Sequence, residues 1–121
     1  QLSNPPILSM AAIRASLDIF HRAGMRRLRD KSIKLTGFLA DSLNALSNDK
    51  ISILTPANPS DRGAQLSLQI QNSDKTLHQK LSDRGVVSDW REPDVIRVAP
   101  APLYNSFQDV HEFVQRLSQC L

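Results

Sequence analysis

Apolar residues in the first third of the chain recur at intervals of three and four, the spacing of one face of an α-helix. Two such stripes are present, the first formed by Met10, Ile13, Leu17 and Phe20 and the second by Leu28, Leu35, Leu39 and Leu46. Gly24 lies between the stripes and predicts an end or a kink of the first helix. The pattern therefore predicts two consecutive helices, the second over about residues 25–46.

The residues before the first stripe are typical of a helix start. Pro5 and Pro6 suit a first turn, because the backbone N–H that proline lacks has no partner there. Asn4 is then predicted to be the N-cap residue.

The middle of the chain changes to strict alternation of apolar and polar residues, which predicts half-buried strands. Strands are expected from Ile51 to Thr55 and from Leu66 to Ile70, with a loop rich in proline between them. A short helix is expected to begin at Ser73 or Asp74 and to end before Gly85.

Two more strands and a helix complete the pattern. Val86 and Val87 are expected to begin the third strand, and Val95 to Ala99 to form the fourth. The last helix has the clearest apolar stripe, and Ser106 and Asp109 before it have capping-box spacing. The order ααββαββα predicts an α+β fold: one domain over residues 1–121, with a mainly antiparallel four-stranded sheet and helices on one face.

Composition narrows the class of protein. With 121 residues, 40% of them apolar and 22% charged, the chain has the size and balance of one globular domain. No apolar run approaches the roughly 20 residues of a membrane span. A single cysteine, Cys120, excludes an internal disulfide, and the net charge of +3 is far from that of a dedicated nucleic-acid binder. Because the chain opens with Gln1 and no signal region follows, we expect a domain of a larger protein.

Familiar catalytic motifs are missing from the sequence. His111 lacks the second histidine one turn on that a zinc-protease helix needs, since Gln115 stands there. His21 and His78 have no metal-ligand spacing, so we expect no metal site. No Gly-x-Ser-x-Gly elbow is present, and Cys120 is expected to be an incidental thiol.

A basic stretch covers Arg22 to Lys34 with only Asp30 to offset it. It is compatible with an anionic partner. No aromatic residues interleave with these charges to stack on bases, so a solvated helix face or ion pairs to another domain are favoured.

Two further positions attract attention on chemical grounds. At the first helix start, the side chains of Ser3 and Asn4 could hold an anion, although simple N-capping by Asn4 is favoured. In Ile96-Arg97-Val98, alternation places Arg97 on the sheet face that points away from the helices. A guanidinium on a rigid strand can bind a carboxylate through two hydrogen bonds, and an exposed arginine on a polar face is an equal alternative.

The sequence also resembles the kynureninase family along essentially its whole length. The resemblance is carried by Ser3-Asn4-Pro5-Pro6-Ile7, Leu35-Thr36-Gly37-Phe38-Leu39, Arg62-Gly63-Ala64-Gln65-Leu66, Arg84-Gly85-Val86-Val87 and the long, specific motif from Ile96 to Phe107. It implies the C-terminal small domain of a pyridoxal-phosphate enzyme with the aspartate-aminotransferase-like fold (fold type I).

The resemblance implies a cytoplasmic homodimer that hydrolyses L-kynurenine or 3-hydroxykynurenine on the tryptophan route toward NAD. In that family the arginine matching Arg97 binds the substrate α-carboxylate. The residue matching Asn4 contacts the cofactor phosphate in the partner subunit's site, and the one matching Ser3 shapes the substrate pocket.

One departure from the family pattern concerns the cofactor. The lysine that holds pyridoxal phosphate in this family belongs to a large domain, and none of the five lysines here lies in a similar context. Trp90 is not a candidate for the aromatic residue that stacks on the pyridine ring. We therefore expect this chain alone to be inactive. Two alternatives stay open: a free-standing α/β ligand-binding or interaction module, and the small domain of a sister enzyme such as a cysteine desulfurase or an aminotransferase.

Overall fold

The computed structural model describes residues 4–121 and confirms the predicted order of elements. The helices are α1 (Ile7–Ala23), α2 (Met25–Ala45), α3 (Lys75–Asp83) and α4 (Phe107–Ser118), with a 3-10 turn η1 (Pro59–Asp61). The strands are β1 (Ile51–Ile53), β2 (Leu66–Ile70), β3 (Asp89–Arg91) and β4 (Val95–Val98).

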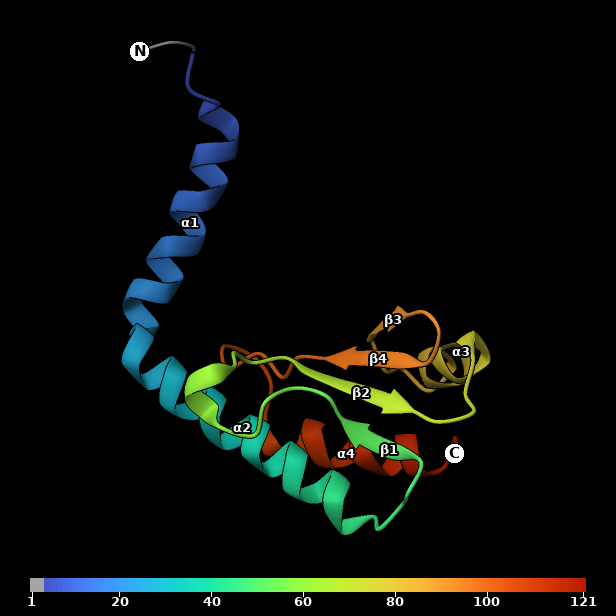
Figure 1. Cartoon of the computed structure of the whole chain (residues 1–121). Coiled ribbons are helices and arrows are strands. Elements are labelled where there is room, and N and C mark those ends of the chain that lie inside the picture. The colour runs from blue at the N-terminus through green and yellow to red at the C-terminus, as the bar shows by residue number, and fades with distance from the viewer. Residues whose placement is uncertain (1–3) are drawn as a thin grey trace.

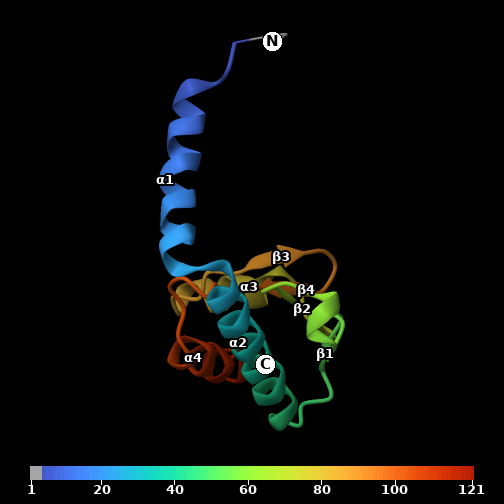
Figure 2. The same ribbon diagram turned by 90° about the vertical axis from the view of Figure 1, so that its left-hand side faces the viewer.

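The strands form one sheet in the order β1-β2-β4-β3, and every neighbouring pair is antiparallel. Helices α2 and α4 lie side by side beneath the same face of the sheet (Figures 1 and 2). The predicted α+β fold with two layers is therefore confirmed.

A single apolar core fills the space between the layers. Leu35 and Leu39 of α2 meet Leu68 of β2 and Ile96 of β4, and none of these four side chains is more than 1% exposed. Helix α3 adds buried leucines to the same core. Alternation along β2 and β4 directs apolar side chains into this core, so the opposite sheet face carries the polar residues.

Helix α1 is the exception, because it buries none of its residues. It runs away from the sheet in both views (Figures 1 and 2). Gly24 separates α1 from α2, as predicted, and its φ of 82° lies in the left-handed region that favours glycine.

Two details of the predicted pattern are wrong. The N-cap residue of α1 is Pro6, with no side-chain capping bond, so Asn4 lies two residues before the N-cap. Val86 and Val87 do not begin a strand, since β3 starts at Asp89. Val86 is drawn into the core while Val87 is 99% exposed, and the backbone reaches strand geometry only where it pairs with β4.

The other helix ends follow the sequence closely. Ser106 and Asp109 form the predicted capping box of α4, and Asp74 caps α3 by accepting a hydrogen bond from the Thr76 backbone. Gly85 follows α3 with a φ of 76°. Over residues 4–121, no helix combines the length and apolar character that crossing a membrane requires.

Candidate functional site

The sheet face that points away from α2 and α4 is polar along its central strands. Antiparallel partners lie on the same face, so Arg97 of β4 stands between Ser67 of β2 and Asp89 of β3. Ile96 and Val98 on either side of Arg97 are buried in the core. The predicted placement of Arg97, on the face away from the helices, is confirmed.

Arg97 is held by an ion pair with the strand beside it. Its Nε donates a hydrogen bond to Oδ2 of Asp89 over 2.6 Å, and its Nη2 donates to the same oxygen. Arg91 also donates to this oxygen through Nε, over 3.0 Å. Two guanidinium groups thus share one carboxylate on an open sheet face, which leaves a net positive charge there.

Asp89 stays ionised in this arrangement. The hydrogen bond from Arg97 lowers the pKa of the Asp89 carboxyl below its usual value, and the positive charges of Arg91 and Arg97 act in the same direction. The Asp89 carboxylate therefore keeps its charge from neutral pH down to mildly acidic pH.

One edge of the Arg97 guanidinium is left open. A guanidinium has five N–H donors, and Asp89 takes those on the Nε side. Nη1 makes no hydrogen bond to the residues that the structure describes, and the Arg97 side chain is 34% exposed. The free edge, formed by Nη1 and the second hydrogen of Nη2, has the geometry that binds a carboxylate through two parallel bonds.

Among the other predicted site residues, the structure describes Asn4 and places it away from this cluster. Asn4 is exposed and precedes α1, the helix that extends away from the sheet (Figure 1). The chain by itself therefore does not bring Asn4 and Arg97 together. Ser3 lies outside the described residues.

Several charges of the basic stretch have structural roles. Arg27 donates through Nε to the Ala23 carbonyl over 2.8 Å, and Lys31 donates to the Pro102 carbonyl over 2.9 Å. Arg29 donates to the Pro59 carbonyl, which ties α2 to the 3-10 turn. These bonds support the structural interpretation of the stretch.

The residues with metal-binding chemistry do not gather. Among residues 4–121, no three His, Cys, Asp or Glu side chains lie close enough to hold a metal ion. His78 contacts the Ser88 carbonyl through Nε2 over 3.2 Å, His111 is exposed, and Cys120 is half-buried at the edge of the core.

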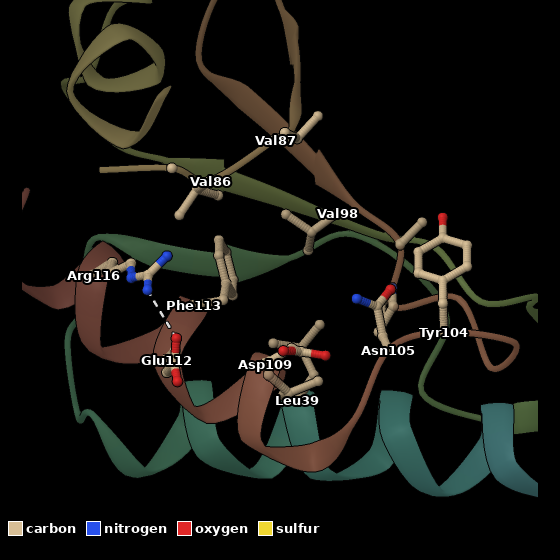
Figure 3. A pocket seen from close by; sticks show the side chains of 14 residues that line it. Leu39, Val86, Val87, Val98, Tyr104, Asn105, Asp109, Glu112, Phe113 and Arg116 are labelled. Atoms are coloured by element: carbon tan, nitrogen blue, oxygen red, sulfur yellow. Dashed lines mark hydrogen bonds and ion pairs between the residues drawn. The ribbon is translucent and has the colours of Figure 1, made fainter. Parts of the chain in front are cut away.

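A hollow of about 440 Å³ opens on the helix side of β4 (Figure 3). Val98 and Phe113 line its apolar part, and Asn105, Asp109 and the ion-paired Glu112 stand at its rim. Neither Arg97 nor Asn4 lines it. It is therefore separate from the polar sheet face.

Asp89 is the partner of Arg97 that the sequence pattern did not reveal. Its contact with Arg97 depends on how β3 is aligned against β4, and a strand that begins at Val86 does not fix that alignment. The sequence Asp89-Trp90-Arg91 could have indicated the contact. Trp90 points into the core, so both charged residues lie on the outer sheet face together with Arg97.

Two solved structures share the fold of this chain. A C-DES mutant with glycine covalently linked to the PLP cofactor superposes with a TM-score of 0.69 and 20% identity, covering 86% of this chain and 27% of that one. A NifS-like protein gives a TM-score of 0.67 at 21% identity, covering 78% and 28%. These likenesses show the fold of the chain, which corresponds to little more than a quarter of each of these solved chains.

The sequence comparisons are more specific. Residues 28–117 match the family model described as the kynureninase C-terminal domain, and the chain belongs to this family. Kynureninase of Stenotrophomonas maltophilia is 52% identical over 97% of the chain, and kynureninase of Myxococcus xanthus is also 52% identical over 97%. The chain spans only 28% of the length of each of these relatives.

Proposed function

We propose that the protein containing this chain hydrolyses the Cβ–Cγ bond of L-kynurenine or 3-hydroxykynurenine. The products are L-alanine and anthranilate or 3-hydroxyanthranilate, which places the reaction in tryptophan catabolism toward NAD. The observation that carries this proposal is the match to kynureninases at 52% identity over 97% of the chain. The likeness to a NifS-like protein, at 21% identity, supports the shared fold and gives no reason to prefer desulfurase chemistry.

In this proposal Arg97 binds the α-carboxylate of the substrate. The free edge of its guanidinium would donate two charge-assisted hydrogen bonds to the carboxylate. Because β4 lies between two other strands, the backbone under Arg97 is fixed. The chain would then contribute by positioning the amino-acid end of the substrate, which is an entropic contribution to the rate.

Pyridoxal phosphate is the cofactor implied by the family. When bound, it supplies the electron-withdrawing ring that the bond cleavage needs. The chain offers only part of such a site. Exposed Asn4 could donate its amide to the phosphate in the partner subunit's site, and Ser3 belongs to the same segment. The five lysines lie on α2, on α3 or before β1, and none of them lies on β3 or β4.

Because the chain offers only part of the site, we infer that it is inactive alone and acts within a larger enzyme. The cofactor lysine would come from a large domain of the same polypeptide, and the intact enzyme would be a cytoplasmic homodimer. The exposed stripe of α1, in which Ile13 is 57% and Leu17 61% exposed, would pack against that large domain.

Replacing Arg97 by alanine in the intact enzyme tests this role. Loss of a charge-assisted pair costs about 1.5–3 kcal/mol, which corresponds to a fall of roughly ten- to a hundredfold in kcat/KM for L-kynurenine. Steady-state kinetics measure the fall, and the absorbance of bound cofactor should survive the substitution.

Arg84→Ala is the matched control, since Arg84 is exposed after α3 and its side chain, within residues 4–121, donates only to the Lys80 carbonyl. We expect its kcat/KM to equal that of the parent. An Arg97→Ala enzyme with unchanged kcat/KM would remove the carboxylate role.

A further inference from the structure

The carboxylate of Asp89 determines where the Arg97 guanidinium can lie. The two residues are cross-strand partners on β3 and β4, so their Cβ atoms start from the same sheet face. Nε and Nη2 of Arg97 both donate to Oδ2 of Asp89. This contact fixes the plane and the direction of a side chain that otherwise has many rotamers.

Asp89 is itself restrained by a second arginine. Arg91, two residues along the same strand, donates through Nε to Oδ2 over 3.0 Å. Both cations therefore bind the same carboxylate oxygen, and a rotation that moves Oδ2 away from Arg97 would also disturb its bond to Arg91.

The direction of the contact leaves the binding edge of Arg97 open. Asp89 occupies the Nε side of the guanidinium, whereas a carboxylate ligand that binds end-on uses Nη1 and Nη2. Asp89 and such a ligand can thus bind Arg97 at the same time.

We propose that Asp89 is a positioning residue, which holds Arg97 by its Nε edge and presents the opposite edge to the α-carboxylate of the substrate. The inference rests on the proposed function, because it concerns the same arginine. It adds that the Arg97 side chain is already ordered before the substrate binds. This side chain therefore loses less rotamer freedom on binding.

The test is a double-substitution cycle in the intact, cofactor-loaded enzyme. Asp89→Ala should lower kcat/KM for L-kynurenine by about three- to tenfold, mostly through KM. In the Arg97→Ala background the same substitution should have no further effect, because Asp89 acts through Arg97. A purely structural role would give equal losses in both backgrounds.

A second readout separates positioning from general damage. Inhibition is measured with two substrate analogues that differ only in the α-carboxylate. Asp89→Ala should weaken inhibition by the analogue that has the carboxylate and leave inhibition by the other analogue unchanged. The alanine variant could lose its cofactor absorbance or have a lower Tm than the parent. In that case Asp89→Asn, which keeps the side-chain shape, replaces it.

The matched control is Asp94→Asn, since Asp94 accepts a bond from Gln69 Nε2 at the start of β4 and has no bond to Arg97. We expect its kinetics to equal those of the parent. If Asp89→Ala leaves KM unchanged or lowers it, the positioning role is wrong, and lower KM would mean that Asp89 competes with the substrate. If Arg97→Ala itself has no effect, the proposed carboxylate role fails instead.

Discussion

At the scale of single residues, the candidate site centres on one arginine, and its neighbours determine where its guanidinium lies. An isolated surface arginine samples many rotamers, and its charge is shared with solvent. Arg97 instead is bonded to Asp89, with its neighbours Ile96 and Val98 buried beneath it. The strand fixes the base of the side chain and the carboxylate fixes its end.

Asn4 gives a prediction at the same scale. The structure shows that Asn4 does not cap α1, because Pro6 is the N-cap residue. Asn4→Ala should therefore leave helix content unchanged, while the intact enzyme should lose pyridoxal phosphate faster during dialysis. Cofactor absorbance measured against dialysis time gives the rate of loss.

Asn44→Ala, at an exposed position near the end of α2, is the control for this experiment. It should retain cofactor as the parent does. Equal retention by Asn4→Ala and the parent would contradict a phosphate contact by Asn4.

At the scale of elements, the sequence predicts the helices and strands that bury one face and leave the other face outside the core. Helices α2 and α4 and strands β2 and β4 each place apolar residues with the period of their own structure, so their faces could be assigned in advance. The same rule placed Arg97 on the outer face.

The start of β3 could not be predicted in this way. Val86 and Val87 have high strand propensity, yet one is buried and the other is 99% exposed, because the chain there turns from α3 toward the sheet. A short strand is defined by its pairing with β4, and that pairing is a tertiary contact. The ion pair between Asp89 and Arg97 was missed for this reason.

Helix α1 was predicted correctly as an element, but its apolar stripe has no cover in the described chain. We expect the isolated chain to self-associate through this stripe, and Ile13→Glu with Leu17→Glu to make it monomeric. Sedimentation velocity over a range of concentrations measures both. An unsubstituted chain that stays monomeric throughout would contradict this expectation and would favour a free-standing module.

At the scale of the whole molecule, we propose that the chain supplies binding groups and that another part of the enzyme supplies the cofactor lysine. It spans 28% of the length of its kynureninase relatives. Its polar sheet face and the unburied α1 are two surfaces for which the described residues offer no cover. Both features are those of a domain that completes a larger structure.

The most direct test is the release of anthranilate from L-kynurenine, measured with added pyridoxal phosphate for the intact protein and for the 121-residue chain alone. We predict multiple turnovers by the intact protein and no release above the uncatalysed rate by the chain. Turnover by the isolated chain, or an intact protein that binds the cofactor and releases no anthranilate, would contradict the assignment.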